Sequence, residues 1–549
     1  MKENLQFIVP TVVPVMLFIY ALIVLKSHKR VVLGQSITLF GIALAILSCW
    51  IVFQYGPIES GLLGSYGLGF SVRMDALSII IFTMISILSY VILKFSHNYM
   101  DGDARKHVFF SRLAVTVASV QFLILSGNLF QILFFWIVTS FCLHYLLVFY
   151  RTRPQAVAAA RKKFIVARIG DVSLLLATAL LFTAFGTGNL QAIFESVANN
   201  TELGPEVYVA TALLVFAAVL KSAQFPSHGW LIEVVETPTP VSALLHAGLL
   251  NAGPFLMVRM SPLMVESTSA SMMLIIIGGF TAMFASIVYL TQPSIKVALG
   301  YSSIAHMGFS LLMCGFGVYS AAILHIVAHS FYKAHSFLSS GSIVDYIRSR
   351  KIDLPKRKGS IVNVIVTLLF TSSIYLFFCD LWGLRFNDNP NLFIVGAIIA
   401  LGVSQILVNI IDVKSSVATI ALSILLTCLV MVSFFTFESM AHQILLSEIP
   451  QYYNTSLVLQ FAMIIVLILY SLVIFIQLLA PNLKQTSWSF QLGVHIRNGL
   501  YANVLFDRVI GSLKHEKFKW ANLEIKEESI DESTIRINDK LISKQIEAL

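Results

Sequence analysis

Apolar residues in this chain occur in long runs separated by short polar connections. A run of roughly 20 residues spans the hydrocarbon core of a bilayer as a helix, so each run predicts one transmembrane span. The first run has no small-residue cleavage site after it, and we interpret it as a span and not as a signal peptide. The pattern predicts an all-α polytopic membrane protein. About 15 spans are expected, at 7–25, 31–54, 76–94, 110–126, 128–150, 163–186, 207–225, 239–260, 269–290, 294–316, 319–345, 360–379, 394–411, 415–437 and 457–480.

Basic residues gather in the connections on one side of these spans. They include Lys26, Lys29, Arg30, Lys94, Arg105, Lys106, Arg151, Arg153, Arg161, Lys162, Lys163, Arg348, Arg350, Lys351, Lys356, Arg357 and Lys358. The other connections are neutral or acidic, with Glu195, Glu202, Glu206, Glu266, Glu438 and Glu448. The positive-inside rule therefore predicts a cytoplasmic C-terminus and an N-terminus outside the cell, as an odd number of spans requires.

Composition narrows the class of protein further. Of 549 residues, 57% are hydrophobic and only 12% are charged, which excludes an ordinary soluble protein. The net charge of +9 lies in short loops between apolar runs, so it indicates topology and not a nucleic-acid surface. The five cysteines have no paired spacing and are interpreted as small core residues.

The stretch 221–259 is the most informative one. Lys221 ends an apolar run, and Pro226 follows after four further residues. Proline breaks a helix, and a broken helix at membrane depth is tolerated where it is buried in protein or lines a wet cavity. Glu236 and His246 come soon after, so we interpret the stretch as a proton or ion path. The alternative is a lysine that extends to the headgroups at a helix end.

A second polar group lies in the run 319–345. His325, His329 and Lys333 are spaced four residues apart, so they share one face of one helix. Buried charges are costly in a membrane, and this face should meet an internal cavity. Two histidines at this spacing also suit zinc, but the adjacent lysine would repel the metal, and a proton relay is the better interpretation. His144 and His306, in other apolar helices, are interpreted as satisfied core histidines.

Other polar residues leave two interpretations open. Arg168 and Asp171 are three residues apart and form either part of the path or a structural ion pair. Arg73 and Asp75 precede the third span and suit an interfacial anchor equally well. Lys296 either extends the relay or lies near a helix end.

The chain lacks several common cofactor motifs. It contains no Walker loop, no Rossmann glycine pattern, no nucleophile elbow and no CxxC. We therefore expect it to bind no nucleotide, flavin or cluster by itself, and to move ions or to support a partner that does.

The end of the chain differs from the rest. Residues 486–513 mix aromatic, aliphatic and charged positions at helical spacing, which suggests a helix on the membrane surface or against a partner. Residues 514–549 are rich in Lys, Glu, Asp and Ile, and suit either a solvated tail or a docking segment that folds on a partner. The whole of 486–549 is the candidate docking region.

Several stretches resemble the antiporter-like membrane subunits of respiratory complex I, chain 5 (L) type, and of Mrp cation/proton antiporters. They are KSAQFPSHGWL, ETPTPVSALLHAG, HIVAHSFYKAHSFLSSGS, and LFFW followed by FIVARIGD. The resemblance implies two inverted repeats of five helices, each with a broken helix, joined by a central polar axis. The implied divisions are N-terminal helices (1–109), a first repeat (110–260), a second repeat (269–411), C-terminal helices (415–480) and a cytoplasmic segment (481–549).

The resemblance also implies roles for particular residues. Lys221 would be the lysine of the first channel, with Asp171 near it and His246 in the axis. His325, His329 and Lys333 would form the central relay.

Two positions depart from the family pattern. Ile137 stands where the family has a channel glutamate, and Cys379 where it has the lysine of the second broken helix. Asp380, beside that cysteine, is the candidate replacement.

This chain is short and divergent for that family, and with its stretch HAGLLNAGPFLMVRM it resembles the DabB-type membrane subunits of DAB inorganic-carbon accumulation complexes. That resemblance implies a bacterial inner-membrane subunit that conducts protons or another cation. Its partner would be a large soluble subunit, similar to carbonic anhydrase, in which the zinc resides. The alternatives are a pump subunit of a complex I-like or Mrp-type assembly, and a passive membrane anchor that needs no buried charges.

Overall fold

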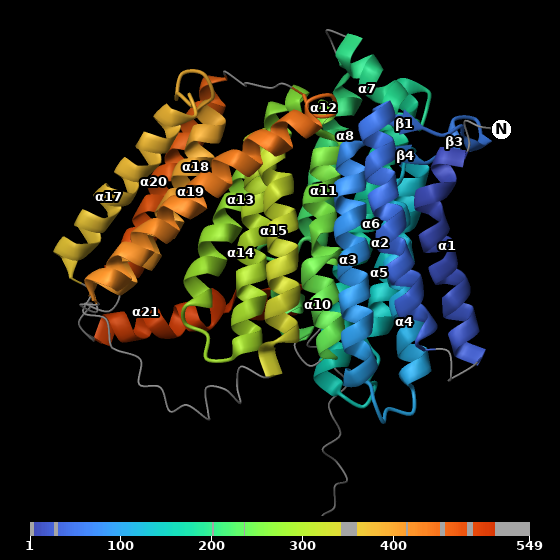
Figure 1. Ribbon diagram of the computed structural model, residues 1–549, viewed down its shortest axis with the longest axis horizontal. Coiled ribbons are helices and arrows are strands. Elements are labelled where there is room, and N and C mark those ends of the chain that lie inside the picture. Colours follow the sequence, from blue (N-terminus) through green and yellow to red (C-terminus); the bar gives the residue numbers. More distant parts are fainter. Residues whose placement is uncertain are drawn as a thin grey trace, which may run out of the picture. The chain divides into compact units, whose positions relative to one another are not determined.

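The structure is a computed structural model that describes residues 5–26, 31–199, 203–234, 237–341, 360–412, 416–450, 456–479 and 487–510. Residues up to Phe506 belong to one compact unit. Its long helices lie side by side and share two ends (Figure 1). We call the end that carries the short strands the β end, and the opposite end, which carries α21, the α21 end.

The N-terminal part consists of two helices, two small antiparallel sheets and a third helix. These are α1 (Leu5–Lys26), α2 (Leu33–Tyr55), β1 (Ile58–Glu59), β2 (Leu63–Ser65), β3 (Leu68–Phe70), β4 (Arg73–Met74) and α3 (Ala76–Tyr99). β1 pairs with β4, and β2 pairs with β3. The α3 helix begins where the Asp75 carboxylate caps it by accepting from the backbone N–H of Ser78 at 2.8 Å.

The first five-span group contains one interrupted helix. Its elements are α4 (Lys106–Ile124), α5 (Leu129–Leu147), α6 (Pro154–Phe185), α7 (Leu190–Asn199), α8 (Pro205–Lys221), α9 (Gly229–Glu233), α10 (Thr239–Ala247), η3 (Leu249–Asn251) and α11 (Ala252–Arg259). α8 stops at Lys221, where Pro226 and the left-handed Ala223 (φ 52°) end the regular helix before α9. The break predicted after Lys221 is therefore present.

The second group runs in the opposite sense. Its elements are α12 (Ser261–Glu266), α13 (Thr268–Tyr289), α14 (Ile295–Gly315), α15 (Tyr319–Leu338), α17 (Ile361–Leu381) and α18 (Pro390–Asp412). α4 runs toward the β end and α13, its counterpart, runs away from it (Figure 1). The α13–α14 contact depends on small residues, because a Cβ at Gly308 would lie 2.7 Å from the Gly278 carbonyl oxygen.

The C-terminal elements are α19 (Val417–Leu445), α20 (Leu457–Leu479), α21 (Ser487–Arg497), η5 (Gly499–Tyr501) and α22 (Ala502–Ile510). α21 lies across the lower end of the bundle in Figure 1. α19 continues eight residues beyond the predicted limit at 437, so the expectation that Glu438 lies in a loop was wrong.

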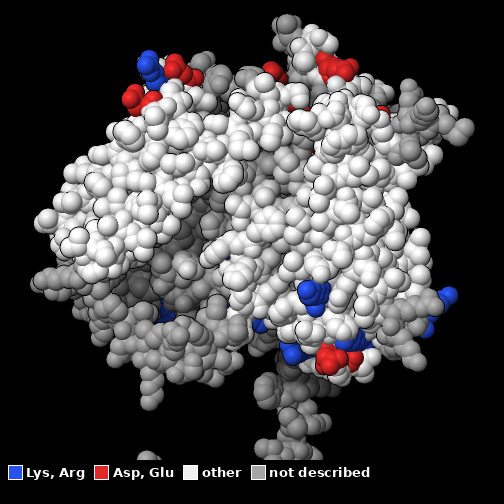
Figure 2. Space-filling view, viewed as in Figure 1, with Lys and Arg blue, Asp and Glu red and all other residues white. Residues whose placement is uncertain are grey.

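The helices account for the predicted membrane spans. Among the described residues, 13 helices or helix groups are long and apolar enough to cross a membrane. α8 and α15 complete the set predicted from the sequence, α8 being short and α15 carrying histidines and a lysine. Figure 2 shows a broad belt with few charges, with Asp and Glu mainly at the β end and Lys and Arg mainly at the α21 end. The all-α polytopic fold with inverted five-helix groups is confirmed.

An ion network fixes the β end. The Asp75 carboxylate is fully buried and pairs with the Arg73 guanidinium at 2.6 Å and with both terminal nitrogens of Arg259. Burial alone would raise the pKa of Asp75, but the Arg259 and Arg73 guanidiniums hold it well below its usual range. Arg73 also lies 3.7 Å from Glu59. These residues join β1, β4, α3 and α11, a more extensive arrangement than an interfacial anchor.

Glu448 connects the end of α19 to the start of α3. Its carboxylate accepts from the backbone N–H groups of Ala76 and Leu77 at 2.6 and 3.0 Å. Such N–H groups at a helix start lack partners within the helix and favour an anion. Burial and the Asp75 charge nonetheless raise the pKa of Glu448 to about 7.

Candidate functional site

Lys221 lies at the break in the first repeat and faces α5. Its ammonium donates to the Trp136 carbonyl oxygen at 3.1 Å and to the Thr139 hydroxyl at 3.3 Å. It also lies 4.4 Å from the centre of the Trp136 indole, a cation–π distance. Two small cavities of about 20 Å³ touch Lys221, each large enough for about one water. Such an ammonium can exchange a proton with water that enters these cavities.

The carboxylate whose charge attracts Lys221 is Asp171 on α6. Asp171 is buried and pairs with Arg168 at 2.6 Å, so the predicted ion pair is confirmed. Ile137, which has no charge, stands on α5 where the family has a channel glutamate. That Asp171 takes part in the path stays a prediction.

A further buried cation, Lys163, lies beside this group. Its ammonium donates to the Ser140 carbonyl oxygen at 2.8 Å and to the Ser140 hydroxyl at 2.9 Å. The pattern of apolar runs predicted that Lys163 lies in a basic connection, but α6 begins at Pro154 and carries it into the protein. The burial of Lys163 was not predicted because the sequence did not show that α6 begins as early as Pro154.

The second polar cluster is built on α15 and α14. His306 Nδ1 lies 3.2 Å from His325 Nε2, and the His306 and His329 rings are 5.0 Å apart. Lys333 is fully buried and donates to the Leu299 carbonyl oxygen at 3.3 Å. The three residues predicted on one helix face thus form, with His306, a column of groups able to bind protons along α15. His306 was interpreted as a satisfied core histidine, and its contact with His325 agrees with that interpretation. Its place beside the predicted relay was not predictable, because sequence spacing does not show which helices pack together.

His246 lies between the two clusters in the chain and packs against α15. Its ring stacks on Phe337 with 4.2 Å between centroids, and α10 packs closely on α15. Asn251, farther along the same segment, donates to the Ser330 hydroxyl at 2.7 Å. The segment α10–α11 therefore connects the Lys221 break to the histidine column.

A large cavity reaches the histidine column from the side. It has a volume of about 460 Å³ and is bounded by α13, α14, α15, α18 and α20. His306 and His325 lie on one wall, and Gln405, Tyr470 and Gln477 contribute polar groups opposite. Figure 2 shows the surface hollowed between the α17–α20 helices and the central helices. The volume is ample for several waters beside the histidines.

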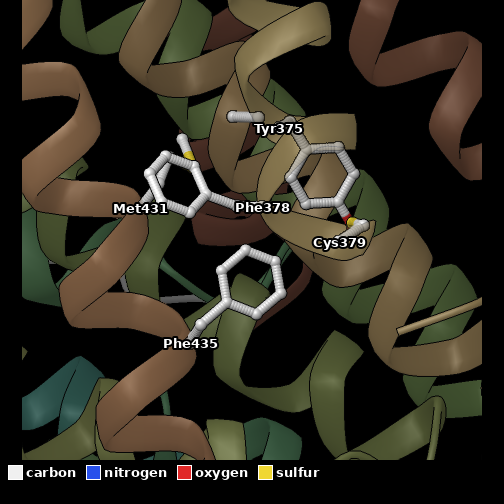
Figure 3. Close-up of a cluster of buried hydrophobic side chains, with 6 residues drawn as sticks. Tyr375, Phe378, Cys379, Met431 and Phe435 are labelled. Atoms are coloured by element: carbon white, nitrogen blue, oxygen red, sulfur yellow. The ribbon is translucent and has the colours of Figure 1, made fainter. Parts of the chain in front are cut away.

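The second repeat departs from the family pattern at the position where the family has a channel lysine. Cys379 is buried in an apolar cluster with Tyr375, Phe378, Met431 and Phe435 (Figure 3). α17 ends two residues later, at Leu381. Asp380 is exposed near that end. Its role in the path stays a prediction.

The remaining predicted residues are placed as follows. Glu236 lies outside the described residues. Lys296 lies at the start of α14 and is half-buried. In the described part of the chain, no group of three His, Cys, Asp or Glu side chains has a geometry that could hold a metal ion.

The C-terminal segment closes the α21 end of the first repeat. Lys162 on α6 donates to Glu233 at 2.7 Å and to the Asn503 side-chain oxygen at 2.9 Å, and Asn503 donates to Glu233 at 2.7 Å. Gln292 donates to the Arg497 carbonyl oxygen at 3.0 Å. Of the predicted docking region 486–549, residues 486 and 511–549 lie outside the described residues, and 497–503 pack on this chain's own helices.

Comparison with known proteins agrees with this architecture. Residues 126–375 match the family model "NADH:quinone oxidoreductase/Mrp antiporter, TM", and residues 62–110 match "NADH-Ubiquinone oxidoreductase (complex I), chain 5 N-terminus". In solved structures, a chain of the Mrp complex from Dietzia sp. DQ12-45-1b matches with a TM-score of 0.60 at 18% identity. That match covers 100% of this chain and 63% of the Mrp chain. The archaeal membrane-bound sulfane sulfur reductase matches with a TM-score of 0.55 at 17% identity, over 93% of this chain and 99% of the other.

Sequence relatives define the family more narrowly. The chain is 35% identical over 499 residues to "Probable inorganic carbon transporter subunit DabB2" of Halothiobacillus neapolitanus, covering 88% of each chain. It is 38% identical to the probable inorganic carbon transporter subunit DabB of Hydrogenovibrio crunogenus, over 58% of this chain and 61% of that one. The chloroplast NAD(P)H-quinone oxidoreductase subunit 5 of Helianthus annuus is 33% identical, over 61% of this chain and 46% of the other. The chain thus belongs to the family of antiporter-like, ion-translocating membrane subunits that includes the probable inorganic carbon transporter subunits of the DabB type.

Proposed function

We propose that this chain is the membrane subunit of an inorganic-carbon accumulation complex and that it conducts protons. The support for the carbon substrate is the relative of Halothiobacillus neapolitanus, which matches over 88% of both chains and is named for that transport. The support for a proton path is the buried set of titratable groups on α8, α10, α14 and α15. In this proposal, proton entry drives hydration of CO2 to bicarbonate in a large soluble partner that resembles carbonic anhydrase and carries the zinc.

The observation that carries the ion path is the burial of Lys333. Its side chain is fully buried at the foot of the histidine column, with a backbone carbonyl as its hydrogen-bond partner. Burying a charge without a counter-ion costs several kcal/mol, so a lysine retained there needs a role beyond packing. A lysine that gains and loses a proton satisfies this requirement.

The proposed orientation places the α21 end in the cytoplasm of a bacterium, with the chain in the inner membrane. The distribution of charges in Figure 2 supports it, because Lys and Arg lie mainly at that end. The N-terminus is then outside the cell and the C-terminus inside.

The test uses a host that grows only at elevated CO2 unless it can accumulate inorganic carbon. The complex is expressed in this host, and growth is measured at air-level CO2. Lys221→Ala, Lys333→Ala and His329→Ala should each abolish growth while the complex still assembles. Lys94→Ala, an exposed lysine on α3, is the matched control and should support growth. Normal growth of all three site variants would refute the path and favour a passive anchor.

A second experiment separates this proposal from a respiratory or antiporter subunit, whose fold the Mrp match shows this chain to share. The complex is purified in mild detergent and its subunits and zinc content are measured. A large soluble zinc-bearing partner supports carbon accumulation. Flavin and iron–sulfur subunits, or several small membrane subunits without zinc, would support the alternative.

A further inference from the structure

Glu438 is a buried carboxyl inside a membrane helix that the proposed path does not use. It lies about two turns before the end of α19, and its side chain is 7% exposed. Among the ion pairs of the described residues, none involves Glu438. An acidic residue buried in a membrane helix is rare and indicates a functional site.

The surroundings of Glu438 form a small polar cavity at the β end. The Ser320 hydroxyl donates to the Glu438 carboxyl at 2.7 Å, and His442 lies one turn farther along α19. The cavity has a volume of about 40 Å³, and Asn389 and Asn391 also line it. That volume holds one or two waters.

Asn391 provides a second observation at this cavity. Its side chain is 4% exposed, and its NH₂ group donates to the Phe316 carbonyl oxygen at 2.7 Å. Its side-chain oxygen has no hydrogen-bond partner among the described residues. A buried acceptor without a partner is unfavourable, and a water in the cavity would satisfy it.

The cavity lies at the start of the helix that carries the histidine column. Ser320 is the second residue of α15, and His325 follows five residues later, or about 7.5 Å along the axis. Toward the other end, α15 carries His329 and Lys333. The apolar cluster around Cys379 occupies the expected channel position of the second repeat. Glu438 is therefore a buried acid that is joined by a hydrogen bond to the start of the helix that carries the column.

We propose that Glu438 is the proton-exchange site at the β end of the column. It takes up a proton from cavity water as its carboxylate becomes a carboxylic acid, and returns it to water that leads toward His325. One O–H bond forms and one O–H bond breaks in each direction, so the step is balanced. This role rests on the proposed function, and it replaces the one expected for Asp380.

The first measurement does not depend on transport. Infrared difference spectra of the purified complex are recorded as the pH is lowered, to detect the C=O stretch of a newly protonated carboxylic acid. Among the bands of the wild type, we expect one that is absent from Glu438→Gln and shifted in Glu438→Asp. Glu266→Gln, an exposed acid at the same end, is the matched control and should retain it. A band unchanged in Glu438→Gln would overturn the proposal.

The second measurement is proton uptake by vesicles that contain the complex. Glu438→Gln should lower the rate about 100-fold, in the range typical of a lost proton-transfer group, and Glu438→Asp should restore part of it. A wild-type rate of proton uptake in Glu438→Gln would overturn the role. Sodium binding by the wild type that is lost in Glu438→Gln would also overturn it, because the site would then bind sodium. If wild-type vesicles take up no protons, the proposed function fails, and the infrared result still decides whether Glu438 exchanges a proton.

Discussion

Replacement of Arg259 by methionine should destabilise the protein strongly, although the residue is not among the predicted path residues. Arg259 pairs through both terminal nitrogens with the fully buried carboxylate of Asp75. Removing one member of a buried ion pair costs about 3–5 kcal/mol, because the other charge remains in the interior. Arg73 still contacts Asp75, so we expect a loss near 3 kcal/mol, or on the order of 100-fold in the unfolding equilibrium.

The assay is unfolding in mixed micelles, followed by the reaction of a thiol-sensitive dye with the buried Cys314. Arg385→Met changes an exposed arginine at the same end and is the control, with an expected effect within about 0.5 kcal/mol. Asp75→Asn combined with Arg259→Met should be less destabilising than Arg259→Met alone, since no buried carboxylate remains. Equal stability of the Arg259 and Arg385 variants would refute the reasoning.

Two further predictions concern the helix contacts. Because burial raises the pKa of Glu448 from its ordinary 4.5 to about 7, its neutral form stabilises the fold at low pH and this contribution is lost as the pH rises through about 7. The melting temperature of the wild type should therefore fall relative to Glu448→Gln between pH 5 and pH 8; parallel curves would contradict this. Gly308→Val should greatly reduce the yield of folded protein, since its Cβ would meet the α13 backbone, whereas Gly402→Val, which has open space around it, should express normally. Equal monodisperse yields on size-exclusion chromatography would contradict the packing argument.

Much of the fold was predictable from the sequence, because an apolar run of membrane length satisfies its backbone hydrogen bonds in lipid by forming a helix. The break after Lys221 followed from proline chemistry, and the shared face of His325, His329 and Lys333 followed from helical periodicity. Both are local properties, fixed within a few turns of the chain.

The contacts between distant segments were not predictable in this way. His306 joins His325 across two helices, and Ser320 reaches Glu438 from another part of the chain. Glu438 was misplaced because the end of an apolar run does not mark the end of a helix. Asp380 was favoured because it neighbours Cys379 in sequence, but adjacent residues on a helix point about 100° apart, and here one is buried and the other exposed.

The contact of Asn503 with Lys162 and Glu233 has a consequence for how the protein is made. Membrane helices are inserted in order during translation, so the first repeat enters the bilayer long before residues 497–503 are synthesised. Until then Glu233 lacks its Asn503 partner, and Gln292 lacks the Arg497 carbonyl oxygen. The wall beside the first break is thus the last part of the bundle to be completed. A chain that stops after α20 would contain every span of the bundle and still leave this end open, so completion of the wall waits until residues 497–503 exist.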